Sequence, residues 1–328
     1  MSTARTGRSI WFLCPVYLDV ESFQALRRDL LHTLLDSREL HGWSVHFVVV
    51  DDTGGVDPDI PRLRGLPDVM VVEPPFNLGH QRAIVYGLRM VADQICDDDI
   101  VVTLDADGED RPADLPRLLA PLLAASASAT SIALARRTWR HESMRFKIMY
   151  AAFRVIFRLL TGVAIRTGNY AAYRGWTAKR LLRHPHFDLC YSSTFISLNV
   201  AIDYVPCPRG HRYAGQSRMN YSRLILHGMR MLMPFTDRLA LRALVLFSAA
   251  FTGGALMALV VVATRVLTTI AVPGWATSAV LLILTLSFVA LGNFVILFAL
   301  FAQSSSISLA NLEDAGNRST RRPSPPSD

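Results

Sequence analysis

Two long stretches without charge near the C-terminus constrain the fold of this chain more than any other feature. No charged residue occurs at positions 243–264 or 266–312, and Pro273 and Gly274 break the second stretch. A hydrocarbon core of about 30 Å takes roughly 20 helical residues to cross. We therefore predict two transmembrane helices, at about 241–264 and 275–302. A hairpin buried in a soluble core is the alternative, which such length and freedom from charge disfavour.

Positive charge beside these spans predicts their orientation. The flanking arginines are Arg218, Arg223, Arg230, Arg238 and Arg242 before the first span, and Arg318, Arg321 and Arg322 after the second. Only Arg265 lies in the link between them. Because cytoplasmic flanks are enriched in arginine and lysine, both ends of the pair are predicted to face the cytoplasm.

The N-terminal run "IWFLCPVYL" resembles the apolar part of a signal peptide, but it is short and no cleavage site of small residues follows. We interpret it as a first β-strand. Four cysteines, Cys14, Cys96, Cys190 and Cys207, lie far apart without the spacing of metal ligands. They fit a structural role in a reducing compartment.

Residues 8–217 alternate between strand and helix patterns. The apolar runs "SIWFLCPVY", "SVHFVVVDD", "DVMVVEPP" and "DIVVTLDAD" are separated by stretches with helical periodicity, such as "GHQRAIVYGLRMVADQI". This alternation predicts an α/β domain with a mostly parallel sheet and helices on both faces. Ligands bind such sheets at the carboxyl ends of the strands, where Tyr17, Asp51, Asp52, Asp105 and Asp107 are expected.

The stretch "VVTLDADGEDRP", residues 101–112, places four carboxylates directly after an apolar strand: Asp105, Asp107, Glu109 and Asp110. Such a cluster repels itself unless a cation or a cationic ligand is bound. Mg²⁺ and Mn²⁺ prefer carboxylate oxygens and are commonly held by one or two of them together with phosphate oxygens. A metal site for a diphosphate is therefore the favoured interpretation.

The cluster has three other interpretations. An EF-hand loop needs glycine at its sixth position and glutamate at its twelfth. Counted from Asp105, this sequence has Asp110 and Pro116 at those positions, so it is not an EF-hand loop. A haloacid dehalogenase-type phosphatase has threonine in place of Glu109 and carries its motif after the first strand. A cluster that only caps the next helix stays open as an alternative.

The segments "CPVYLD", "VVVDD", "PFNLGHQRAIVYGL", "VVTLDADGEDRP" and "RYAGQSRMNYSRL" occur in the order and spacing of the family 2 glycosyltransferases. They most closely resemble the polyprenyl-phosphate sugar transferases typified by dolichyl-phosphate mannose synthase. The resemblance covers about residues 10–225, and paired C-terminal spans are common in bacterial members. It implies a GT-A (Rossmann-like) fold at a bacterial-type inner membrane, with the catalytic domain and C-terminus cytoplasmic.

This resemblance assigns roles on the donor side. By it, Pro15, Tyr17, Asp19 and Asp51 line the nucleoside pocket, Asn77, Gly79 and Gln81 form the loop that closes over the nucleotide with Asp105 nearby, and Asp107 and Glu109 hold the Mg²⁺ or Mn²⁺ that bridges the diphosphate. The sequence departs from the family at Leu18, where asparagine is usual, and at Glu109, where many members have glutamine. The second change adds negative charge at the metal.

The acceptor side is predicted to be positively charged. A phosphate acceptor is already anionic, so it needs cationic groups that place it and no general base. The residues assigned to it are Arg136, Arg145, Arg212, Ser217 and Arg218. Arg212 is also predicted to be catalytic, together with Asp107 of the acidic stretch. Arginine suits this task because its planar fork holds phosphate in one orientation.

Some of this positive charge has an alternative explanation. Lys147, Arg154 and Arg158 share one face of a helical pattern that has Ile148 and Val155 on the other. Such a basic amphipathic helix can lie on anionic lipid headgroups, and "NYSRLILHGMRMLMPF" has a similar character. The net charge of +7 therefore indicates a membrane surface, and the sequence carries no recognised nucleic-acid-binding motif.

The predicted organisation is a cytoplasmic catalytic domain at 1–217, an interfacial segment at 218–238, two spans within 239–303 and a disordered cytoplasmic tail at 304–328. The predicted activity is inverting transfer of a sugar from a nucleotide-diphosphate sugar to polyprenyl phosphate, for synthesis of a cell-envelope glycan. The alternatives are transfer to a glycan or glycolipid hydroxyl with Asp188 as base, a phosphatase of the haloacid dehalogenase type, and a non-catalytic membrane scaffold. The sequence leaves association with further copies of the chain open.

Overall fold

A computed structural model describes residues 8–124, 132–137, 144–165, 167–184, 186–188, 190–198, 200–214, 221–268 and 274–304. The strands are β1 (Ser9–Val16), β2 (Ser44–Asp51), β3 (Val69–Val72), β4 (Ile100–Thr103), β5 (Ile132–Arg137), β6 (Thr167–Arg174) and β7 (Ile202–Cys207). The helices are α1 (Val20–Leu35), α2 (His80–Val91), α3 (Leu115–Leu123), α4 (Met144–Thr161), α5 (Gly175–Leu181), α6 (Tyr191–Ser197), α7 (Tyr221–Leu232), α8 (Thr236–Leu267) and α9 (Trp275–Ser304).

The strands form one seven-stranded sheet in the order β3-β2-β1-β4-β6-β5-β7. The first four run parallel, and β5 is parallel to β7. Only β6 among them runs the other way, antiparallel to both β4 and β5. The predicted mostly parallel sheet is confirmed. Its parallel half brings the carboxyl ends of β1, β2 and β4 to one edge.

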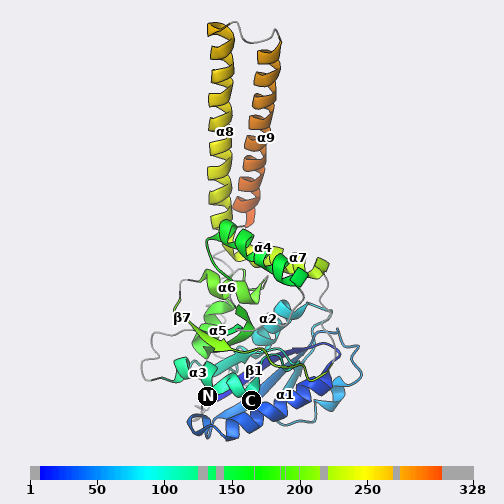
Figure 1. Cartoon of the computed structure of the whole chain (residues 1–328). Coiled ribbons are helices and arrows are strands. Elements are labelled where there is room, and N and C mark those ends of the chain that lie inside the picture. The colour runs from blue at the N-terminus through cyan, green and yellow to red at the C-terminus, as the bar shows by residue number, and fades with distance from the viewer. Residues whose placement is uncertain are drawn as a thin grey trace, which may run out of the picture. The chain divides into compact units, whose positions relative to one another are not determined.

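Helices cover both faces of the sheet, as predicted (Figure 1). On one face, α1 and α3 bury leucines such as Leu26 and Leu118 against Phe12 and Phe47. On the other, α2 and α6 bury Leu88 and Phe195 against Trp11 and Val48. Because every strand residue of β1 and β4 is buried, these strands are apolar throughout rather than alternating.

The chain divides into two compact units. The first comprises residues 1–158 and 163–234, and the second comprises residues 159–162 and 235–328. The second unit is dominated by α8 and α9, which pack along one another. Gly254 permits a close approach there, because a Cβ at this position would lie 2.5 Å from Ser287 Oγ. Both helices are long and apolar enough to cross a membrane by length and composition, so they are candidate membrane spans.

Two helices of the first unit, α4 and α7, lie side by side (Figure 1). A Cβ added at Gly228 of α7 would lie 2.8 Å from the ring of Phe153 in α4, so the backbones approach closely. Both helices leave large apolar side chains exposed, including Ile148, Val155 and Met229. The apolar positions that the periodicity assigns to one face of α4 are thus solvent-exposed, and the buried side is formed by Phe157.

Candidate functional site

Side chains predicted to bind the donor meet at the carboxyl edge of the parallel strands. Val16, the last residue of β1, pairs with Asp51 at the end of β2, and Leu13 pairs with Thr103 at the end of β4. Tyr17 and Asp105 follow these strands directly. The structure therefore brings together the segments that the sequence analysis assigns to nucleotide binding, as expected for parallel strands.

Asp51 offers an unused acceptor at this edge. Its Oδ1 accepts hydrogen bonds from the Thr53 backbone nitrogen at 3.1 Å and from Thr53 Oγ1 at 2.6 Å. Its Oδ2 is buried without a hydrogen-bond partner among the described residues. A buried acceptor without a partner is costly, so a donor supplied by a ligand would stabilise it. Pro15 is buried, Tyr17 is exposed and Asp19 is partly buried at the start of α1.

Asp52 anchors the predicted nucleotide loop. Its Oδ1 accepts hydrogen bonds from the backbone nitrogens of Leu78 at 2.7 Å and Gly79 at 3.2 Å. Asn77 Nδ2 donates to the Asp52 carbonyl at 2.6 Å. Burial raises the pKa of the Asp52 carboxyl, and these backbone donors oppose that rise. Asp52 therefore holds the loop to the end of β2. The sequence predicted that Asp52 lies at the carboxyl edge of the sheet but assigned it no role.

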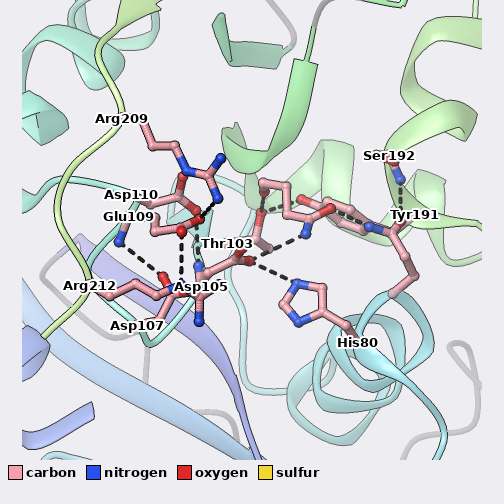
Figure 2. Close-up of polar contacts among 12 residues, drawn as sticks. His80, Thr103, Asp105, Asp107, Glu109, Asp110, Tyr191, Ser192, Arg209 and Arg212 are labelled. Carbon is pink, nitrogen blue, oxygen red and sulfur yellow. Dashed lines mark hydrogen bonds and ion pairs between the residues drawn. The ribbon is translucent and has the colours of Figure 1, made fainter. Parts of the chain in front are cut away.

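Gln81 connects three elements instead of facing open solvent. Its Oε1 accepts a hydrogen bond from the Ser192 nitrogen of α6 at 2.9 Å, and its Nε2 donates to Asn169 Oδ1 of β6. Asn169 Nδ2 in turn donates to Asp105 Oδ1 at 3.3 Å. Figure 2 shows this chain of contacts leading to the acidic residues. Its predicted contact with the nucleotide stays a prediction.

His80, the first residue of α2, completes this network. Its Nε2 lies 2.8 Å from Asp105 Oδ1. Burial lowers the pKa of the imidazole, but the negative charges of Asp105, Asp110 and Asp107 outweigh burial and raise the pKa above its usual value. Positive charge at His80 therefore offsets part of the repulsion within the acidic cluster.

Asp107 and Glu109 converge on one arginine, Arg212 (Figure 2). Arg212 Nη2 lies 2.9 Å from Asp107 Oδ2, and Arg212 Nε lies 2.8 Å from Glu109 Oε1. Arg209 Nη2 lies 2.5 Å from Glu109 Oε2. The two acidic residues are only 9% and 7% exposed. Burial, followed by the charge of Asp105, raises the pKa of Asp107 to about 6.

Residues 209–213, here called the arginine segment, lie against the acidic loop formed by residues 105–110. Gly210 N donates to the Glu109 carbonyl at 2.8 Å, and Tyr213 N donates to the Asp107 carbonyl at 2.9 Å. A Cβ at Gly210 would lie 2.4 Å from the Gly108 carbonyl oxygen. Tyr213 also donates its hydroxyl to Asp29 Oδ2 of α1 at 2.7 Å. Glycine at positions 108 and 210 therefore permits the arginine segment to approach the acidic loop closely.

Asp107 and Glu109 have the chemistry required of a site for Mg²⁺ or Mn²⁺. Their oxygens already surround one cationic group, Arg212, so a cation at that point would be coordinated by both residues. Among the described residues, no group of three or more His, Cys, Asp or Glu side chains is arranged to hold a metal. Two carboxylates are the usual protein contribution when substrate phosphates and water fill the remaining positions.

The predicted acceptor residues are not gathered in the described part of the chain. Arg136 lies partly buried in β5. Ser217, Arg218 and the side chain of Arg145 lie outside the described residues, and Arg212 pairs with the acidic residues. Their acceptor role stays a prediction. Asp188, the base expected for a hydroxyl acceptor, forms an exposed ion pair with Arg89 at 2.7 Å.

A protein-family model and several solved structures are similar to this chain. The family model described as Glycosyl transferase family 2 matches residues 23–177, which span β2, β4 and the acidic loop. The matched segment, slightly less than half of the chain, resembles a family 2 glycosyltransferase domain. The chain is a glycosyltransferase, and its sheet is GT-A-like. No curated protein sequence matches the chain significantly.

Two solved structures are similar to this chain at low sequence identity. Glucosyl-3-phosphoglycerate synthase from Mycobacterium tuberculosis, in complex with Mn²⁺, UDP and glucosyl-3-phosphoglycerate, is 19% identical with a TM-score of 0.48, over 71% of this chain and 80% of that one. Mannosyl-3-phosphoglycerate synthase from Rubrobacter xylanophilus is 11% identical with a TM-score of 0.45, over 71% and 74%.

Sequence analysis missed three residues of the site. His80 stands inside the quoted "NLGHQR" loop, and Arg209 lies three positions before Arg212 in "RGHRY", so charge opposite the acidic cluster could have identified both. Asn169 gave no such signal. It reaches Asp105 only because the antiparallel strand β6 pairs with β4, a pairing that no local pattern predicts.

Proposed function

We propose that this glycosyltransferase moves a sugar from a nucleotide-diphosphate sugar to a polyprenyl phosphate, with inversion and with a divalent cation, at the cytoplasmic face of a membrane. The observation that carries the donor half is the convergence of Asp107 and Glu109 on one cationic position at the edge where Asp51 has an unused acceptor. Asp51 Oδ2 would accept a hydrogen bond from the nucleobase.

Cleavage of the donor builds positive charge on the sugar and negative charge on the leaving diphosphate. A cation held by Asp107 and Glu109 would neutralise that leaving group. The loop tied by Asp52 would close over the nucleotide, and the Gln81–Asn169 contact would hold Asp105 and α2 in register beside it. These residues are held by backbone and side-chain contacts within one unit, which supports a donor site on this edge of the sheet.

The acceptor half rests on charge and on the membrane-facing surfaces. A phosphate acceptor is already anionic and needs no general base, and Asp188 is engaged with Arg89 on the surface. The first unit exposes apolar residues on α4 and α7, and the second contains two candidate spans. Both features suit an enzyme whose acceptor is a lipid embedded in the same bilayer.

Extraction of a labelled product tests the acceptor class. Membranes that contain the protein are incubated with polyprenyl phosphate and a panel of radiolabelled nucleotide sugars, with membranes lacking the protein as control. The proposal predicts that label from one donor enters organic solvent as an acid-labile lipid. Label that is resistant to mild acid, or that appears in a water-soluble glycan, would favour the hydroxyl acceptor instead.

A further inference from the structure

Two carboxylates of the acidic loop, those of Asp107 and Glu109, are matched in charge by two arginines. Asp107 and Glu109 contribute two negative charges, and Arg209 and Arg212 contribute two positive charges within 2.9 Å of them. A divalent cation carries the same charge as these two guanidinium groups. The cation and the arginines would therefore contact the same carboxylate oxygens, and each neutralises the pair completely.

We propose that the arginine segment is a displaceable occupant of the cation site, and that a divalent cation enters by exchange with the guanidinium groups of Arg209 and Arg212. This inference rests on the proposed cation site at Asp107 and Glu109. Arg209, whose Nη2 pairs with Glu109 Oε2, is a positioning residue that sets how readily the exchange occurs.

The way in which the segment is attached supports exchange. None of residues 209–213 is fully buried, and His211 and Tyr213 are exposed. The segment is held by hydrogen bonds and ion pairs to the acidic loop and by Tyr213 on α1, not by apolar packing in either core cluster. Most of the segment also lines an open groove of about 580 Å³, together with Asp29, His32 and Thr33. Lifting the segment therefore leaves the core intact.

The exchange would have a consequence for the substrate. Guanidinium groups that leave the carboxylates remain next to the diphosphate that the cation bridges. Arginine pairs with phosphate oxygens through two parallel hydrogen bonds, so the released groups would hold phosphate in a fixed orientation. The same two arginines then neutralise the acidic loop before the donor binds and phosphate afterwards.

Mn²⁺ titration of the purified full-length protein in detergent, followed by the electron paramagnetic resonance signal of free Mn²⁺, tests the competition. In Arg209→Gln one competing cation is gone, so the Mn²⁺ dissociation constant should fall by at least about tenfold. Arg209→Lys keeps the charge without the fork and should give an intermediate value. The matched control is Arg111→Gln, because Arg111 is close in sequence and its side chain pairs with Asp114 instead. This control should shift the constant by less than about threefold.

Hydrogen exchange supplies a second readout. In the wild type, saturating Mn²⁺ should speed exchange of the Gly210 and Tyr213 amides, which donate to the Glu109 and Asp107 carbonyls without the metal. Equal Mn²⁺ affinity in Arg209→Gln and the wild type, equal tightening in Arg111→Gln, or protection of these amides by Mn²⁺ would overturn the exchange. A wild type that binds no Mn²⁺ at all would instead refute the proposed cation site itself.

Discussion

At the scale of single residues, one residue at the donor edge has a backbone conformation that is unfavourable for a residue with a side chain. Leu18 is the only non-glycine residue with positive φ among the described positions, at 52°. It follows Tyr17 directly and is exposed, so packing does not explain the leucine side chain. In the left-handed region Cβ lies too close to the carbonyl oxygen, at a cost of roughly 1–2 kcal/mol, which asparagine reduces by local hydrogen bonding.

Leu18→Asn should therefore raise the free energy of unfolding by roughly 0.5–1 kcal/mol, measured by thermal unfolding of the protein in detergent. Leu18→Ala is the control, because it removes the exposed side chain and keeps the Cβ that causes the strain. An equal gain in both variants would show that the exposed leucine side chain, and not φ, is the cause.

His80 predicts a pH dependence of stability. Its folded pKa is raised above the usual value of about 6.5, so its pairing with Asp105 stabilises the fold fully below that pH and is lost as pH rises through the folded pKa. His80→Gln should lower the unfolding temperature at about pH 5.5 and have little effect at about pH 9. Because the imidazole is partly exposed, the difference should stay near or below about 1 kcal/mol. It should vanish in an Asp105→Asn background, and persistence there would contradict the pairing.

At the scale of elements, the acidic loop and the arginine segment depend on glycine where they meet. Gly108 has φ of +86°, and a Cβ there would lie 2.5 Å from the ring of Tyr213. Gly55 has a similar φ of +85° but nothing within 4 Å of its added Cβ. An alanine would therefore have a disfavoured φ at either position, but only at position 108 would its Cβ also meet a neighbouring side chain.

Gly108→Ala should lose more stability than Gly55→Ala, by about 1–3 kcal/mol, because only the first also displaces the tyrosine. Thermal unfolding of both variants in detergent measures this difference. Equal losses in the two variants would mean that the arginine segment does not rest on the loop as described.

Elements also show what the sequence could predict. The strands β1 and β4 were predictable because all their residues are buried and nearly all are apolar. The strands β2 and β3 were predictable from their valine-rich runs, although β3 is only partly buried. The strands β6 and β7 were not predicted, because β6 contains polar residues such as Asn169 and β7 exposes Tyr204. The acidic residues could be predicted as a ligand site because they come directly after a buried strand. The ion pair between Glu109 and Arg209 joins positions 100 residues apart, which local patterns do not encode.

At the scale of the whole molecule, we propose that the first unit carries out catalysis and that the second attaches the protein to the membrane. The charge-free stretches in the sequence correspond to α8 and α9, so these helices were predictable from composition. A lipid phosphate acceptor requires no general base, so a carboxylate outside the acidic loop should be dispensable for transfer. Asp188 is such a carboxylate, and it forms an exposed ion pair with Arg89.

Asp188→Asn should leave the rate of transfer within about tenfold of the wild type, because general-base catalysis is usually worth a hundredfold or more. The rate constant is measured with saturating donor and lipid phosphate. A loss of about a thousandfold would indicate that Asp188 accepts a proton from a hydroxyl acceptor, and the acceptor class would have to change.

The most direct test of the central claim is the rate of sugar transfer with and without a divalent cation, in the wild type and in Asp107→Ala. The account predicts that excess chelator abolishes transfer by the wild type and that Mg²⁺ or Mn²⁺ restores it. Asp107→Ala should lose about a hundredfold or more in rate, since removing a catalytic charge contact typically costs about 2–4 kcal/mol. Full transfer in excess chelator would contradict the assignment of Asp107 and Glu109 as the cation site.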